Sequence, residues 1–203
     1  MFAALRRAWQ RYVASIPVTP EPEQVSDKEI LNELRPAPVD RKIVTAFGAL
    51  ATLVLAHLPD ADRAAQARRL RSRLKPDTSA AEALGAWIAA SSGPKSRIGV
   101  IALDWKAREE VSWQAKRLCA AHDVSIEWEY DAATDQEWKG WQERAEAPVE
   151  SPLRSFAAAL NATRVVLFRF PVDDSVYAFA VAQERGGEAF ELCRELGIDV
   201  VTE

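Results

Sequence analysis

The hydrophobic pattern of the chain changes near residues 91–96, and this change restricts the folds that the sequence can adopt. Before it, apolar residues recur at helical spacing in segments that prolines separate. After it, short apolar runs of strand length alternate with helical segments, which is typical of α/β proteins. The sequence therefore predicts a helical region over residues 1–93 and an α/β domain over residues 94–203.

Prolines and capping residues bound the helices that we expect in the helical region. Asp40 is a candidate N-cap, and Pro59 ends the long apolar segment that follows it. The expected helices cover residues 2–16, a short segment from Ser26, the segment from Asp40 to Pro59, residues 60–75, and a segment after Ser79 that contains Leu84, Trp87 and Ile88. We expect this region to pack on the sheet of the α/β domain.

Strand signals in the second region predict a mixed sheet of about five strands. Residues 97–103 form an apolar run typical of a buried strand, and residues 124–131 alternate between apolar and polar side chains. Two further runs flank a turn at residues 171–175 and predict a hairpin, and residues 198–201 form a terminal strand. The expected helices cover residues 106–122, a segment from Thr134 with Trp138 and Trp141, residues 153–160, and a segment that ends at Gly197. The expected order is β-α-β-α-α-β-β-α-β, with parallel crossovers and one hairpin.

Composition and targeting signals are typical of a cytoplasmic protein. Apolar residues make up 48% of the 203-residue chain, which is ample for a packed core. Two cysteines, Cys119 and Cys193, cannot build a disulfide framework for a chain of this length. The longest apolar run, residues 46–58, is shorter than the roughly 20 residues of a membrane span. The amphipathic segment 2–16 either packs on the protein core or binds a membrane surface.

Charge is distributed unevenly along the chain. The first 96 residues carry a net positive charge and the remainder a net negative charge, within a total of −4. Acidic side chains concentrate in residues 121–150. These regions of opposite charge either attract each other or present an acidic face to a basic partner.

Residues 60–75 form a strongly basic segment. Its cations are Arg63, Arg68, Arg69, Arg71, Arg73 and Lys75. Its acids lie at the start of the expected helix and its cations toward the end, which is the distribution that the helix dipole favours. No aromatic residue lies between the arginines. This pattern favours a solvated face or a contact within the protein over a contact with nucleic acid.

A search for catalytic motifs yields few candidates. The sequence lacks the glycine-rich phosphate loops, the nucleophile elbow and the zinc-protease motif, and it has two histidines. Cys119 and His122 have the helical spacing of a nucleophile pair or of two metal ligands. They share an apolar stripe with Val111 and Leu118, which favours a place in the core. We therefore expect no cofactor and no bound metal.

Three carboxylates form the best catalytic constellation. Asp104 follows the first expected strand, at the edge where α/β sheets bind ligands. Glu127 and Glu129 lie on one face of the next expected strand, about 7 Å apart, close enough to share a divalent cation. This set predicts, as an alternative function, a metal-dependent hydrolase or nuclease. The structural alternative is that Asp104 caps the following helix and that both glutamates face solvent.

Trp113 differs from the other six tryptophans. It lies opposite the apolar stripe of the expected helix 106–122. It either lies in a seam between the two regions or anchors a partner protein. The seam is favoured, because a large exposed ring is a liability in a monomer.

A short motif resembles a known family. Residues 102–106 read Ala-Leu-Asp-Trp-Lys, the next helix carries Val111 and Trp113, and a strand–helix–strand unit runs from Val176 to Val201. These features resemble the domain-of-unknown-function family 6630 over roughly the last hundred residues. The resemblance implies a small bacterial α/β domain with a variable N-terminal extension. It brings no activity and no catalytic residue.

The acidic segment and the missing catalytic motifs favour a non-catalytic interaction protein over an enzyme. Its most specific form is an immunity- or adaptor-like protein that binds a basic partner protein, with nucleic acid not favoured as a partner. The candidate contact residues are Trp113, Glu127, Glu129, Asp131 and Asp135.

Overall fold

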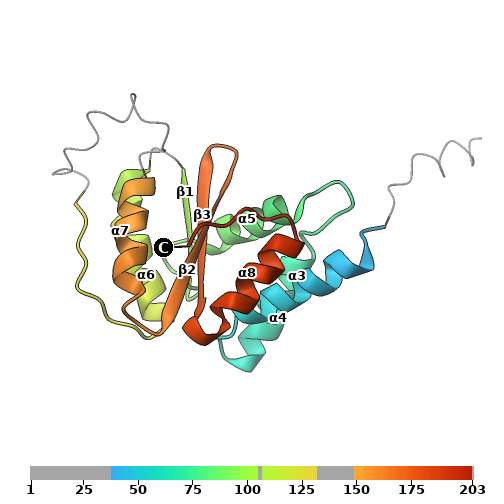
Figure 1. The fold of residues 1–203 in the computed structure, drawn as a ribbon, viewed down its shortest axis with the longest axis horizontal. Helices are drawn as coiled ribbons and strands as arrows, with labels where there is room; N and C mark the ends of the chain where they lie inside the picture. The colour runs from blue at the N-terminus through green and yellow to red at the C-terminus, as the bar shows by residue number, and fades with distance from the viewer. Residues whose placement is uncertain (1–37, 105–106, 132–148, 203) are drawn as a thin grey trace, which may run out of the picture. The chain divides into compact units, whose positions relative to one another are not determined.

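Three antiparallel strands form a sheet with helices on both of its faces (Figure 1). The computed structural model describes residues 38–104, 107–131 and 149–202. The strands are β1 (Val100–Asp104), β2 (Val165–Val172) and β3 (Ser175–Ala182). The helices are α3 (Arg41–Val54), α4 (Asp60–Arg71), α5 (Ala80–Ser91), α6 (Arg108–Ala121), α7 (Glu150–Leu160), the 3-10 helix η2 (Gln183–Arg185) and α8 (Gly186–Glu195).

Several predictions fall outside the described residues. These are the segment 2–16 with its membrane alternative, the helix from Ser26, the helix with Trp138 and Trp141, and the contact residue Asp135. In the described ranges, no helix combines the length and the apolar character needed to cross a lipid bilayer.

The sheet has the order β1-β3-β2, with β3 in the centre. The register pairs Val172 with Ser175, which leaves Asp173 and Asp174 as a two-residue hairpin turn. Asp173 has a φ of 49°, as such tight turns require. The predicted hairpin is therefore confirmed, with a turn shorter than the predicted range.

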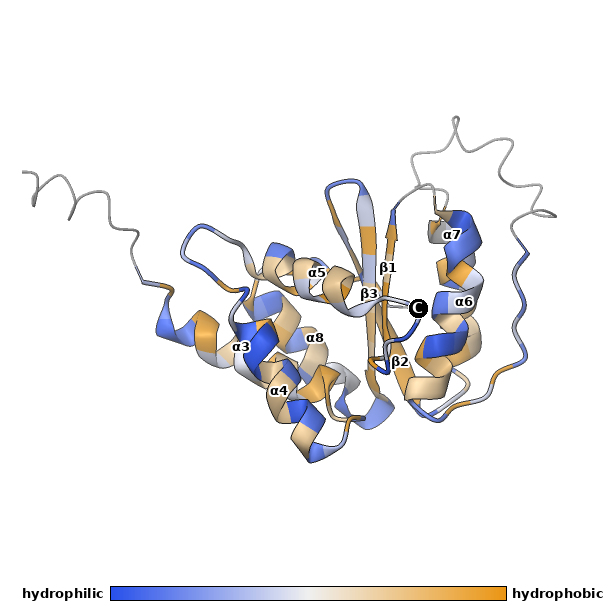
Figure 2. Ribbon diagram, turned by 180° about the vertical axis from the view of Figure 1, so that it is seen from behind, coloured by the Kyte–Doolittle hydropathy of each residue, from blue (hydrophilic) through white to orange (hydrophobic). Residues whose placement is uncertain are grey.

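Both faces of the sheet are buried, which explains why the strands are almost continuously apolar (Figure 2). Alternate residues of β3 point to opposite faces. Val176, Ala178 and Ala180 belong to the core under α6 and α7, whereas Tyr177, Phe179 and Val181 belong to the core under α3, α5 and α8. The prediction of an α/β protein is confirmed, and α3 and α5, which precede the sheet in sequence, pack on it.

A close approach places α5 directly on β3. A Cβ atom added at Gly85 would lie 2.9 Å from the ring of Tyr177, so the glycine allows the helix to come this near. Trp87 and Leu84 of the same helix are buried in the core that includes Phe168 and Phe179. The helix that forms one wall of the site described below is thus fixed to the sheet.

Helix ends follow the local signals in the sequence. The Asp40 side chain accepts a hydrogen bond of 2.8 Å from the Lys42 amide, which confirms the predicted N-cap of α3. Gly197 follows α8 with a φ of +67°, and the Ile198 amide donates to the Cys193 carbonyl at 2.8 Å. This is the Schellman arrangement that a glycine after a helix favours.

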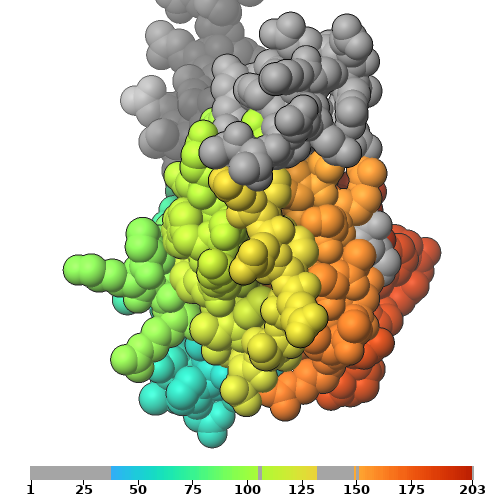
Figure 3. All heavy atoms as spheres, turned by 90° about the vertical axis from the view of Figure 1, so that its left-hand side faces the viewer, coloured from blue at the N-terminus to red at the C-terminus, as the bar shows by residue number. Residues whose placement is uncertain are grey.

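The prediction of a five-stranded mixed sheet is not confirmed, since the described sheet has three antiparallel strands. Residues 124–131 are not a strand. Their predicted alternation exists, but the half-buried side chains pack on α6 and α7, between which the segment lies (yellow in Figure 3). Alternate burial needs only an extended backbone against an apolar surface. At the C-terminus, Val201 forms one isolated bridge to Arg169 in place of the expected strand 198–201.

Candidate functional site: a basic pocket between α4 and α5

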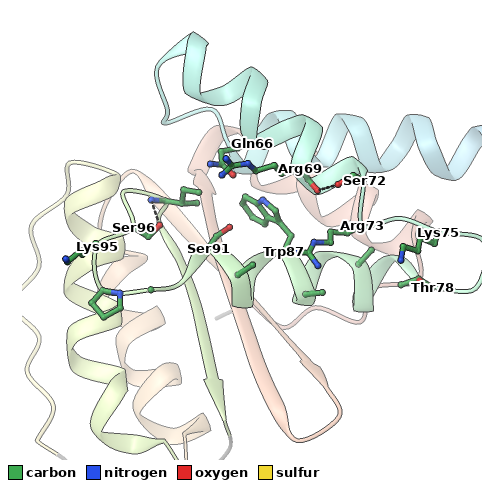
Figure 4. A pocket seen from close by; sticks show the side chains of 16 residues that line it. Gln66, Arg69, Ser72, Arg73, Lys75, Thr78, Trp87, Ser91, Lys95 and Ser96 are labelled. Carbon is green, nitrogen blue, oxygen red and sulfur yellow. Dashed lines mark hydrogen bonds between the residues drawn. The ribbon is translucent and has the colours of Figure 1, made fainter.

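A pocket of about 1110 Å³ lies between α4, α5 and the loop 93–98 (Figure 4). One wall comes from α4 and the residues that follow it, and the opposite wall comes from α5. The loop between α5 and β1 closes one end. The predicted boundary between residues 93 and 94 falls within this loop.

The α4 side of the pocket is cationic. Gln66 and Arg69 lie at helical spacing on one face of α4, and Arg73 and Lys75 follow the end of the helix. Lys95 adds a fourth cation from the loop. No carboxylate lines the pocket, and none of the four cations forms an ion pair within the described residues. The pocket therefore carries uncompensated positive charge.

Other arginines in the basic segment have structural roles. Arg63 pairs with Asp60 at 3.4 Å and donates to the carbonyls of Ala56 and Leu58, at 3.2 and 2.9 Å. Arg71 donates to the Ala67 carbonyl of its own helix at 3.2 Å. Arg63 thus makes the contact within the protein that the sequence predicts for this segment. Arg69 and Arg73 instead line the pocket.

Trp87 lies at the centre of the pocket view, below the α4 side chains (Figure 4). Its side chain is buried, at 2% exposure, yet its indole Nε1 has no hydrogen-bond partner among the described residues. A buried N–H group without an acceptor costs about 1–3 kcal/mol. This unpaired N–H group lies within the wall of the pocket.

Apart from the buried Trp87, the α5 wall consists of small side chains. Ala83, Ala86, Trp87 and Ala90 share one face of the helix, at the spacing i, i+3, i+4 and i+7. Ala86 and Ala90 are exposed. Larger side chains at these positions would project into the space opposite α4. The alanines therefore help to keep the pocket open.

Arg117 of α6 holds the loop at the end of the pocket. Its guanidinium donates to the carbonyls of Ser91 and Gly93, at 3.3 and 3.0 Å, and to that of Val100. It also lies 5.5 Å from the ring centre of Trp113, which is half-buried. Trp113 is therefore placed beside the α5–β1 connection, and its predicted role as a partner contact stays a prediction.

The structure does not bring the three predicted carboxylates onto neighbouring strands. Asp104 is exposed at the end of β1. Glu127 and Glu129 are exposed on the segment that packs on α6 and α7, because that segment does not pair with the sheet. Within the described ranges, no group of three or more His, Cys, Asp or Glu residues is placed to hold a metal ion. Asp131 is exposed on the same segment.

Cys119 and His122 lie in the core, as the apolar stripe indicates. Burial raises the pKa of the Cys119 thiol. Burial lowers the pKa of His122 to about 4, and the neighbouring His57 adds to this effect. The two imidazole rings lie 4.3 Å apart, centre to centre. A protonated thiol and a neutral buried imidazole fit a structural role.

Sequence comparison places the pocket inside a family domain. Neither the curated proteins nor the solved structures contain a match to the chain. The family model described as "Domain of unknown function (DUF6630)" matches residues 46–203, which include α4, α5, the pocket and the whole described sheet. The match also extends the predicted resemblance toward the N-terminus, into α3. Since the family model matches most of the length of the chain, the chain belongs to the DUF6630 family.

Proposed function

We propose that the protein is a non-catalytic binding domain that holds an anionic ligand in the basic pocket. One observation carries the proposal: among the described residues, four cations and no carboxylate line a single concavity. Arginine and lysine side chains and hydroxyl groups are donors that bind anions. The lining residues also include no imidazole and no thiol. These groups are suited to binding and orienting a ligand.

The helix dipole accounts for only part of this charge. Cations in the last turn of a helix are favoured without any ligand, which applies to Arg69. Lys75 lies beyond the end of α4, and Lys95 comes from a different segment. Their gathering around one cavity raises the local positive potential. A bound anion would relieve the repulsion among them.

Titration calorimetry with pyrophosphate tests this proposal. The wild-type protein is expected to bind pyrophosphate. The variant Arg69→Ala/Arg73→Ala is expected to bind it at least about tenfold more weakly, since each charged hydrogen bond contributes about 1.5–3 kcal/mol. Arg68→Ala is the matched control, because Arg68 is exposed on α4 and does not line the pocket. The proposal would be contradicted if the two variants lost the same affinity for pyrophosphate, or if the wild type did not bind it.

A second candidate function is the binding of a basic partner protein, in the manner of an immunity or adaptor protein. Glu127, Glu129 and Asp131 form an acidic row on the segment 124–131, and all three are exposed. The residues between them anchor the segment: Trp128 donates from Nε1 to the Ser155 hydroxyl at 2.8 Å. Its ring also packs 5.0 Å from that of Phe156, centre to centre. This anchoring supports a stable presentation of the row.

Reversing the charge of the acidic row tests the second candidate. Affinity purification from the native host is expected to recover a basic protein with the wild type and to lose it with Glu127→Lys/Glu129→Lys. Both glutamates are exposed, so the substitutions leave the core intact. Glu195→Lys makes the same type of substitution at an exposed position of α8. This variant is expected still to recover the basic partner protein. Recovery of the same protein with all three forms would exclude a role for the row.

A further inference from the structure

The two walls of the basic pocket differ in chemistry. The α4 side supplies Arg69, Arg73 and Lys75, whereas the α5 side supplies alanines and the buried Trp87. A ligand that contacts both walls needs a charged part and an apolar part. Neither part alone uses the whole surface of the pocket.

The cations favour a phosphate group as the charged part. Arg69 lies in the last turn of α4 and Arg73 in the turn that follows the helix, and both side chains line the same pocket. A guanidinium binds phosphate oxygens through two parallel hydrogen bonds. A phosphate monoester carries close to two negative charges at neutral pH and offers three such oxygens. It therefore matches paired arginines better than a single carboxylate does.

The alanine wall favours an apolar body. Ala86 and Ala90 are exposed at positions that face the cavity, and Ala83 continues the same face toward the core. Binding becomes more favourable when an apolar group displaces water from exposed apolar surface in a concavity. The volume of about 1110 Å³ also exceeds what one inorganic phosphate ion can fill.

A nucleic-acid strand fits these walls poorly. Single strands bind through bases that stack on aromatic side chains, together with a basic groove. Trp87, the one aromatic residue among the described residues that line the pocket, is only 2% exposed, so its ring face offers no stacking surface. Its Nε1 is buried as well and has no hydrogen-bond partner among the described residues.

We infer that the basic pocket binds a small organic phosphate monoester with an apolar body. This inference rests on the proposed function and adds the class of ligand. The phosphate lies against Arg69 and Arg73, and the apolar body lies along Ala86 and Ala90.

Calorimetry with three probes tests the inference: 1-naphthyl phosphate, inorganic phosphate and 1-naphthol. Naphthyl phosphate is expected to bind at least about tenfold more tightly than either of the others, because it alone contacts both walls. Ala86→Leu fills the apolar wall and is expected to abolish this preference. Ala89→Leu is the control, since Ala89 is exposed on α5 but does not line the pocket.

The possible outcomes separate the two proposals. Equal affinity for naphthyl phosphate and inorganic phosphate would overturn the apolar body and leave the anion pocket standing. No binding of naphthyl phosphate, inorganic phosphate or pyrophosphate would overturn both. If a single-stranded oligonucleotide binds more tightly than naphthyl phosphate and displaces it, the pocket is a nucleic-acid site and the inference of a small ligand is wrong.

Discussion

Replacing Gln114 by alanine will lower the free energy of unfolding by about 3 kcal/mol, because two backbone groups of β1 lose their partner. The Gln114 side chain is 1% exposed and lies against the outer edge of the sheet. Its Oε1 accepts from the Ala102 amide at 2.9 Å, and its Nε2 donates to the Ala102 carbonyl at 2.7 Å. Urea denaturation followed by circular dichroism measures the loss.

Two methionine variants separate hydrogen bonding from packing. Gln114→Met keeps the length of the side chain but leaves both Ala102 groups unpaired, so we expect it to retain most of the loss. Lys116→Met, at an exposed position on the same helix, is expected to change stability by less than about 0.5 kcal/mol. A wild-type denaturation midpoint for Gln114→Met would show that hydrogen bonding at this edge contributes little.

The same contact explains why the sheet ends at β1. An edge strand has unpaired amide and carbonyl groups that another strand can bind. Here, side chains of α6 form hydrogen bonds with these groups: Gln114 binds the amide and carbonyl of Ala102, and Arg117 donates to the Val100 carbonyl. The outer edge of β1 is therefore occupied at the positions where a further strand would pair.

Residues 124–131 show what a sequence pattern does and does not specify. Their alternation predicts one buried face, and the structure has this face. The pattern does not specify whether the covering surface is a sheet neighbour or a helical layer, because both bury every second side chain. That choice depends on backbone groups elsewhere in the fold, such as those bound by Gln114. By contrast, Asp40 and Gly197 act through neighbours in sequence, so both helix ends were predictable.

The basic pocket was harder to predict for a related reason. The sequence shows the cations of residues 60–75 and the alanines near Trp87 as separate features. A helix dipole explains the first feature, and a packed helix explains the second. Only the tertiary arrangement brings Arg73 and Ala86 to opposite walls of one cavity. The closeness of Arg69, Arg73 and Lys75 in the sequence was the available signal.

Acidification from pH 7 to pH 5 will destabilise the protein by about 2 kcal/mol, through the buried His57–His122 pair. Burial lowers the pKa of His122 from 6.5 to about 4, and burial also lowers that of His57. The folded state thus keeps both rings neutral at a pH where the unfolded chain binds protons. The contribution is complete above about pH 6.5 and is lost as the pH falls toward 4.

The His122→Gln variant isolates this effect, because it removes the titrating group and keeps a polar side chain. The cations that also lower the two pKa values, Arg164 near His122 and Arg63 near His57, stay charged throughout this range. Urea denaturation at pH 7, 6 and 5 is therefore expected to show a smaller decrease in unfolding free energy for the variant than for the wild type. Equal decreases in the two proteins would mean that His122 takes up its proton without opening the core, and that groups elsewhere set the acid sensitivity.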